Sequence, residues 1–309
     1  MSNTTRLAAY SPHTKVQYLH NILFLTEGAL QVCGNSIILL AIARSKALHR
    51  KQYINVVALA IGDLLCGLNQ LLNAPWRLHL LASGTLNQVI ANPLDCFQHP
   101  QIHFLLFSGY LLPTVLLLVS IDRLLACSSI RLYSKITTKM NLLFIAMAYV
   151  IAAGFYSLSV YVTFVTPLNG RKAQRQCRLP FALSVGMSIL FWLYQFFVSI
   201  AAVLMYLIAF LVLKCDISPE LNAIMKQKKE RERKVTVTLA WVSLFTVIFY
   251  IVPLGLIIVA TVTPLGMLVL NLGLGHICFI IMNTNSINNI FIYIYKNSHL
   301  RNGILSSNT

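Results

Sequence analysis

The stretch Ser120-Ile121-Asp122-Arg123-Leu124 follows an apolar run, Phe104–Val119, that contains no charged residue. A charge placed in hydrocarbon costs at least about 2.5 kcal/mol, so charged residues in membranes lie at the interface, pair with each other or serve a function. An ordinary interfacial ion pair that anchors a helix end would explain Asp122 and Arg123 as well as a functional pair would. The rest of the chain decides between these two interpretations.

The composition indicates a membrane protein with many spans. Of the 309 residues, 57% are hydrophobic and only 10% are charged, and the mean hydropathy is +0.73. A soluble domain carries about 25% charged residues. The net charge of +16 does not indicate nucleic-acid binding, because the basic residues lie between long apolar runs and not on one soluble face. The first 21 residues contain no apolar core, so no cleavable signal peptide is expected.

Seven apolar runs are long enough to cross a membrane as helices. They are Ile22–Ala43, Ile54–Trp76, His103–Ala126, Asn141–Thr166, Phe181–Leu213, Val235–Val262 and Gly266–Tyr295. Their continuous hydrophobicity excludes membrane β-barrel strands, which alternate and have roughly ten residues. The predicted fold is an all-α bundle of seven transmembrane helices. It has an outer tail (residues 1–21), a helical domain (22–295), and a short amphipathic helix with a tail (296–309).

The distribution of Lys and Arg predicts the orientation of the chain. If the N-terminus is outside and the C-terminus is cytoplasmic, sixteen basic residues fall in the cytoplasmic segments and seven on the other side. The cytoplasmic segments would be 44–53, 127–140, 214–234 and 296–309. This orientation places the triplet Asn3-Thr4-Thr5, an N-glycosylation acceptor, outside.

Polar residues inside the spans need partners in hydrocarbon. We expect Asp63, in the second span, to be the only acid in the middle of the membrane, where it takes up a proton or finds amides, water or a cation. The first span contributes Asn35, and the seventh contributes a polar run: Asn283, Asn285, Ser286, Asn288 and Asn289. Together these residues predict one polar centre that can hold water or a sodium ion. The alternative is a neutral Asp63 that only fixes packing.

Cysteines and prolines give two further expectations. Cys96 and Cys177 are the two cysteines in outer loops, the oxidising side, so a disulfide between them is predicted over two unrelated thiols. Pro253 in the sixth span and Pro113 in the third would kink their helices. The basic run Lys226–Lys234 before the sixth span suggests a helix whose cytoplasmic end can swing, and it also fits an anchor beside anionic lipid.

In their order and spacing, these features resemble a rhodopsin-like G-protein-coupled receptor over essentially the whole chain. The resemblance rests on Gly34-Asn35, the Leu-Ala-x-x-Asp that ends at Asp63, Cys96 with Cys177, Asp122-Arg123, Pro253, and Asn289-Ile290-Phe291-Ile292-Tyr293. Within that superfamily, the Ser120–Leu124 stretch, the short loops and the total length are similar to the nematode serpentine chemoreceptors of the srsx branch.

The resemblance implies roles for individual residues. Asp63 would match a sodium-site aspartate, and Asn35, Asn285, Ser286 and Asn289 would complete the polar core. Asp122 would hold Arg123, which later meets a heterotrimeric G protein. Pro253 would be the hinge of the sixth span, and Tyr206 and Tyr293 would swing inward on activation.

The chain departs from the family pattern at several positions. Leu124 replaces an aromatic residue after Asp122-Arg123, and Ile290 stands where the seventh span usually has proline. Ile251 stands where many members have tryptophan, and the 27 residues from Cys96 to Arg123 exceed the usual spacing. These departures concern the details of switching and not the fold.

The expected ligand is a small, weakly polar molecule, with a short peptide, as in neuropeptide receptors, as an alternative. Span seven has no lysine before Lys296, which excludes a retinal Schiff base, and residues 103–119 lack the acid that usually anchors amines. The outer half instead offers apolar and aromatic side chains with a few polar groups, although many of them could simply be packing. They are His103, Leu106, Phe107, Tyr161, Trp192, Tyr194, Gln195, Leu254, Ile258, His276, Phe279 and Asn283. The basic loop 171–178, with Arg77, favours an anionic ligand or an acidic peptide.

Two other classes of membrane protein are alternatives to a receptor. An intramembrane enzyme would need paired catalytic groups or metal ligands, and no such motif is present. A transporter or channel remains the alternative, although the chain shows no internal repeat. The expected partners are a heterotrimeric G protein, a ligand and membrane lipid, with no nucleic acid. No metal or cofactor is expected beyond a structural sodium ion. The expected location is the plasma membrane, with a sensory cilium as one site.

Overall fold

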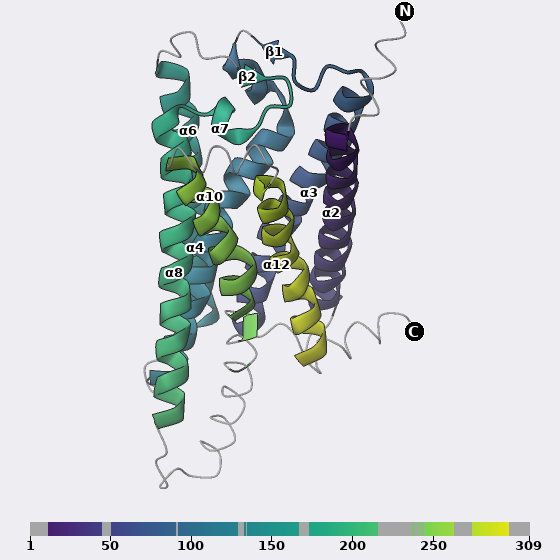
Figure 1. Cartoon of the computed structure of the whole chain (residues 1–309). Coiled ribbons are helices and arrows are strands. Elements are labelled where there is room, and N and C mark those ends of the chain that lie inside the picture. The colour runs from purple at the N-terminus through teal and green to yellow at the C-terminus, as the bar shows by residue number, and fades with distance from the viewer. Residues whose placement is uncertain are drawn as a thin grey trace, which may run out of the picture.

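A computed structural model shows the chain as a bundle of long helices (Figure 1). It describes residues 12–44, 51–90, 92–128, 133, 135–166, 173–215, 237, 241–242, 244–262 and 274–296. The predicted spans correspond to α2 (Pro12–Arg44), α3 (Lys51–Ala82), α4 (Pro100–Ser128), α6 (Thr138–Val165), α8 (Val185–Cys215), η3 (Val247–Ile251) with α10 (Val252–Val262), and α12 (Leu274–Lys296). Five helices are long and apolar enough to cross a membrane, and shorter apolar helices, Leu244–Ala260 and Ile277–Ile292, represent the sixth and seventh spans. The prediction of an all-α membrane bundle is confirmed.

Helix α4 forms the centre of the bundle, and α6 lies at its edge. Four α4 side chains have no exposed surface: Leu106, Tyr110, Leu111 and Val115. In contrast, α6 exposes a run of apolar side chains: Leu142, Leu143, Met147 and Val150. An apolar outer face of this kind matches lipid and not water.

Glycines bring α2 and α3 close together. A Cβ added to Gly28 would lie 2.8 Å from the Cβ of Gln70, and one added to Gly67 would lie 3.0 Å from the Cβ of Gln31. Small residues allow this backbone approach between membrane helices. The approach places the side chains of Gln31 and Gln70 at the α2–α3 interface.

Ile290, the residue found in place of the seventh-span proline, packs against the first span. A Cβ on Gly34 would lie only 2.5 Å from the Cδ1 atom of Ile290. Gly34 therefore leaves the space that the Ile290 side chain fills. This contact joins α2 to α12, next to the position of Asn35.

Several helix boundaries differ from the prediction; α3, for example, continues to Ala82 and not to Trp76. Helix α2 begins at Pro12, so part of the predicted outer tail is helical, and the side chain of Asn21 donates to the carbonyl of Gln17 in the same helix at 2.8 Å. Proline is favoured at the first position of a helix. Helix α8 begins at Val185 and not at residue 181, because Leu183 is extended and the backbone N–H of Ser184 donates to the hydroxyl of Thr163 at 3.3 Å.

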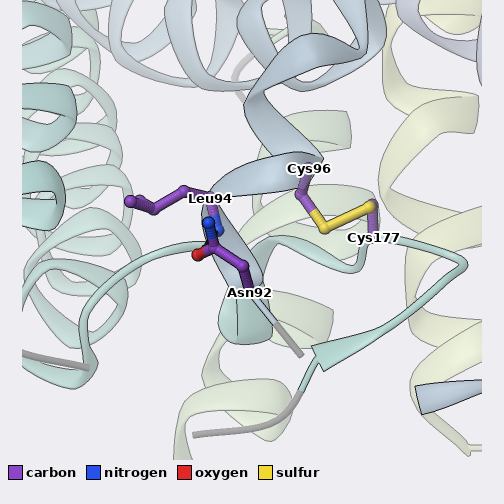
Figure 2. Close-up of a disulfide and its surroundings, with 4 residues drawn as sticks. All are labelled: Asn92, Leu94, Cys96 and Cys177. Atoms are coloured by element: carbon purple, nitrogen blue, oxygen red, sulfur yellow. Dashed lines mark hydrogen bonds between the residues drawn. A yellow bond between two sulfur atoms is a disulfide. The ribbon is translucent and has the colours of Figure 1, made fainter. Parts of the chain in front are cut away.

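One end of the bundle is tied together by a disulfide. Strand β1 (Val89–Ile90) pairs antiparallel with β2 (Ala173–Gln174), and the short helices η2 (Pro93–Gln98) and α7 (Leu179–Ala182) lie nearby. Cys96 of η2 is bonded to Cys177, as Figure 2 shows. The two Cα atoms are 5.3 Å apart. The predicted disulfide is confirmed. It joins the start of α4 to the segment that follows α6.

The sixth span is not a simple proline-kinked helix. It contains a π-helical turn, η3, directly before α10, in which Pro253 is buried at the second position. Proline has no backbone N–H, so the hydrogen-bond ladder is interrupted at this position. A π-turn is a rare and often functional local solution to such an interruption. Pro113, in contrast, lies within the continuous helix α4.

Candidate functional site

Arg123 is buried and held by two neighbours at the end of the bundle opposite the disulfide. Its side chain is only 1% exposed. The Nε atom of Arg123 donates to Oδ2 of Asp122 at 3.0 Å, and its Nη2 atom contacts the same oxygen. Nη2 also donates to the hydroxyl of Tyr133 at 2.7 Å. An exposed interfacial anchor therefore does not describe this ion pair.

Two asparagines that the sequence reasoning missed complete this network. The side-chain amide of Asn55 donates to Oδ2 of Asp122 at 3.2 Å, and the amide of Asn141 donates to Oδ1 of Asn55 at 3.1 Å. Both amides are buried. A buried ion pair is tolerated only when further hydrogen bonds satisfy its remaining atoms, and these amides supply them across α3, α4 and α6. The available signal was an amide at the start of each of the second and fourth spans.

Asp63 lies in a second polar centre with residues of α12. The hydroxyl of Ser286 donates to Oδ1 of Asp63 at 2.6 Å, and the side chain of Asn289 also interacts with this carboxylate. Asn35 is also buried, but its side-chain amide donates to the backbone carbonyl of Gln31 in its own helix at 2.9 Å. The structure thus brings Asp63 together with Ser286 and Asn289, and directs the Asn35 amide elsewhere.

The oxygens around Asp63 fit a sodium ion. The side-chain oxygens of Asn285 and Asn289 are buried and have no hydrogen-bond partner among the described residues. Hard cations take oxygen ligands, and a carboxylate, a hydroxyl and amide carbonyls supply them. Asp63, Ser286 and Asn289 would hold the ion, which would balance the charge of the carboxylate. Asn285 precedes Ser286 on α12, and no contact joins it to Asp63 among the described residues.

Asp63 was expected to be the only acid in the middle of the membrane, and the structure shows a second buried acid in a predicted span, Glu27 on α2. Its side chain is 9% exposed, and the hydroxyl of Thr284 donates to its Oε1 atom at 3.2 Å. The start of α2 at Pro12 places Glu27 about 22 Å along that helix and not at its outer end. The signal was present, since Glu27 lies within the predicted span Ile22–Ala43.

His103, an expected ligand residue, is already engaged by the protein. Its Nδ1 atom lies 2.8 Å from the hydroxyl of Tyr156, and its Nε2 atom lies 2.7 Å from the carbonyl of Phe97. Phe107 packs edge-on against the ring of Tyr156, with 6.1 Å between their centroids. These contacts give His103 and Phe107 a packing role, joining α4 to α6.

The other expected ligand residues fall into three groups. Trp192 and Phe279 pack ring to ring at 5.8 Å, with Ile258 partly buried in the same core. Leu106 and Leu254 are fully buried. Gln195 accepts a hydrogen bond from the hydroxyl of Tyr250, and Tyr194 shares one with Thr114.

Tyr161 and His276 are the last two residues of the expected ligand set. Tyr161 is 65% exposed on the outer face of α6, so its assignment to the ligand-binding interior is wrong. The side chain of His276 lies outside the described part of the structure.

Asn283 connects the ligand residues with α2 and α3. Its backbone carbonyl accepts a hydrogen bond from the side-chain amide of Gln31 at 2.9 Å. Its side-chain oxygen lies 3.9 Å from the sulfur of Cys66. Asn283 is one helical turn from Phe279, so polar and aromatic groups meet on α12.

The remaining expected residues are only partly described. Tyr206 is buried on α8. Tyr293 lies on α12, but its side chain is outside the described part. Asn3, the run Lys226–Lys234 and the tail 297–309 also lie outside the described residues.

At the disulfide end, the described loop arginines bind amides and not acids. Nη1 of Arg175 donates to Oε1 of Gln88 at 3.1 Å, and Nε of Arg178 donates to Oε1 of Gln176 at 2.8 Å. Partial burial, with a smaller contribution from the charge of Arg175, lowers the pKa of His99. Residues 171 and 172 of the predicted basic loop lie outside the described residues.

Comparison with known proteins identifies one family. No curated protein matches the chain. The model of the family described as "Serpentine type 7TM GPCR chemoreceptor Srsx" matches residues 29–307. This match covers the polar centre around Asp63, the disulfide and the Asp122–Arg123 network. The chain therefore belongs to the Srsx family of serpentine seven-transmembrane G-protein-coupled chemoreceptors.

Proposed function

We propose that this receptor binds a small molecule or a short peptide from outside the cell and activates a heterotrimeric G protein on the cytoplasmic side. The family contains chemoreceptors and not enzymes. The disulfide end would face outside, in agreement with the larger number of basic residues in the opposite segments. The plasma membrane, including a sensory cilium, is the proposed location.

The observation that carries this proposal is the burial of Arg123. It is 1% exposed and bonded to both Asp122 and Tyr133 at the proposed cytoplasmic end. The two alternative states would be a closed one, in which Asp122 and Tyr133 hold Arg123, and one in which Arg123 is released to a partner. Ligand binding would shift that equilibrium by its difference in affinity for the two states.

The elements that would move lie in the sixth and seventh spans. The π-turn η3 precedes Pro253, where the helix ladder is already interrupted. Trp192 and Phe279 lie on the proposed outer side of this turn and would contact the ligand. A sodium ion at Asp63 would stabilise one of the two states.

GTP exchange tests this proposal. Membranes that carry the chain or its Arg123→Ala variant are assayed on a panel of G proteins, with and without pooled small odorants. We expect exchange that depends on the chain and is lost in the variant at equal surface expression. Exchange that is equal in both would reject the assigned role of Arg123. Ligand-driven ion or solute flux without exchange would favour the transporter or channel alternative.

A further inference from the structure

A cluster of buried polar side chains joins α2, α3 and α12 on the disulfide side of Asp63. Figure 1 shows α12 beside α2, and hydrogen bonds connect them. We name it the Glu27 cluster; its members are Glu27, Gln31, Cys66, Gln70, Asn283 and Thr284. Gln70 follows Asp63 by seven residues, about 10 Å along α3, whereas Cys66 and Thr284 lie between Gln70 or Glu27 and the Asp63 centre, so the two polar groups adjoin each other.

Among the described residues, no basic side chain forms an ion pair with the carboxylate of Glu27. Thr284 donates to its Oε1 atom, whereas its Oε2 atom has no hydrogen-bond partner among the described residues. The only ion pair in the described part of the chain joins Arg123 and Asp122. Burying an unpaired carboxylate is costly, so this group either takes up a proton or binds a cation or a strong hydrogen-bond donor.

Two buried amide oxygens of the cluster also lack a hydrogen-bond donor among the described residues. Gln31 and Gln70 have no exposed surface, and the Oε1 atom of each has no partner in the described residues. Two amide nitrogens of the cluster, Nε2 of Gln70 and Nδ2 of Asn283, also have no described partner, so a ligand here can meet donors as well as acceptors. The close approach at Gly28 and Gly67 holds both side chains at the α2–α3 interface. Gln31 also donates to the carbonyl of Asn283, which fixes its amide.

Three acceptor oxygens with one negative charge match a particular chemical group. A primary ammonium has three N–H donors and one positive charge, as the side chain of lysine does. A hydrogen bond between an ammonium and a carboxylate is about twice as strong as a neutral one. Among the described residues, no three His, Cys, Asp or Glu side chains form a metal-binding group. A carboxylate with amide oxygens is also a donor set for a hard cation, so the experiment below compares an ammonium ion with sodium.

We propose that the Glu27 cluster binds the primary ammonium group of an amine ligand. This inference rests on the proposed receptor function and names the class of its ligand. The missing acid in residues 103–119 excludes only the usual anchor, and Glu27 supplies a different one on α2. The apolar body of the amine would lie toward Phe279, one turn from Asn283, and its partner ring Trp192.

The charge of the outer loop affects the rate of binding more than the final contacts. Arg175 and Arg178 create a positive field at the disulfide end. Such a field slows the approach of a cation and leaves the interior hydrogen bonds unchanged. The amine is therefore expected to associate slowly.

Thermal unfolding of the purified full chain tests the site without a G protein. Melting temperatures are measured with methylammonium chloride, tetramethylammonium chloride or sodium chloride at equal ionic strength. Methylammonium keeps the three N–H donors, whereas tetramethylammonium has none. We expect a saturable rise in melting temperature with methylammonium alone. At ten times the dissociation constant, the unfolding equilibrium should shift about 11-fold.

Variants assign the effect to Glu27. Glu27→Gln keeps the size of the side chain and should abolish the methylammonium effect, whereas the control Asp95→Asn, at an exposed acid of η2, should retain it. Gln70→Leu removes an amide without a described partner, so it should stabilise the free receptor and weaken methylammonium binding. If Gln70 had only a structural role, Gln70→Leu would change the stability of the free receptor without weakening methylammonium binding.

Three outcomes would overturn the proposal. They are no methylammonium effect on the folded chain, an equal effect in Glu27→Gln, or stabilisation by sodium through Glu27 without any effect of methylammonium. The last would identify an inorganic cation site. Because the assay needs no G protein, failure here leaves the exchange experiment on Arg123 intact, and failure there leaves this test intact.

Discussion

At the scale of single residues, a charged group is held by a small number of polar atoms. Arg123 has Asp122 and Tyr133 as partners, and Asp122 is supported by Asn55. Each hydrogen bond to a charged group contributes about 1.5–3 kcal/mol. Removing one of them should therefore change the balance between the closed and released states by a measurable amount.

Tyr133→Phe removes one such bond without changing the size of the side chain. We expect higher ligand-independent GTP exchange, because Arg123 loses the acceptor that Nη2 contacts at 2.7 Å. The shift in equilibrium should be about tenfold or more. The control is Tyr149→Phe on α6, whose hydroxyl has no partner among the described residues. Equal basal exchange in Tyr133→Phe and the native chain would contradict the restraint.

Gly34→Ala should destabilise the bundle, because the new Cβ would lie 2.5 Å from Cδ1 of Ile290. Overpacking of this kind costs about 1–3 kcal/mol, which should appear as a lower melting temperature. Adding Ile290→Ala should restore part of the loss by making room. The control Gly154→Ala places its Cβ where no atom lies within 4 Å, and it should not destabilise the chain. If adding Ile290→Ala did not raise the melting temperature of Gly34→Ala, the loss of stability would come from another contact.

At the scale of elements, the disulfide is a tie between segments that are 81 residues apart. Cys96→Ser, Cys177→Ser and the double variant should all lose about 2–4 kcal/mol of stability, because each removes the same bond. Thermal unfolding of the three variants checks this equality. Cys33→Ser, at an exposed free cysteine, is the control and should have little effect. A double variant clearly less stable than either single one would show that the thiols act separately.

The sixth span contains the element most suited to rearrangement. Pro253→Ala returns a backbone N–H to the helix beside η3, so the ladder can close and the π-turn can regularise. We expect higher thermal stability and a several-fold lower maximum of ligand-driven exchange at equal surface expression. Pro75→Ala is a matched control, since Pro75 also lies inside a helix but is exposed on α3. Unchanged exchange in Pro253→Ala would remove the hinge role.

At the scale of the whole molecule, orientation in the membrane decides which end meets the ligand. The larger number of basic residues in segments 44–53, 127–140, 214–234 and 296–309 predicts an outer N-terminus. Expression in glycosylating cells should therefore modify Asn3. Glycosidase treatment should shift the native chain on a gel, and Asn3→Gln should remove that shift. A protease-protected N-terminal tag on intact cells would contradict this orientation.

The sequence by itself determined the number and kind of spans, because hydrophobicity over about 20 residues depends only on local composition. It also determined the Cys96–Cys177 pair, since only two cysteines fall in outer loops. Hydrogen bonds between side chains of different helices join residues that are far apart in the sequence, so only the tertiary structure showed them. The hydrogen bonds of Asp122 and Arg123 come from Asn55 and Tyr133 on other segments, and the bond from Thr284 to Glu27 depends on how α2 and α12 meet. Long-range packing selects such partners, and a linear pattern does not encode which faces will meet.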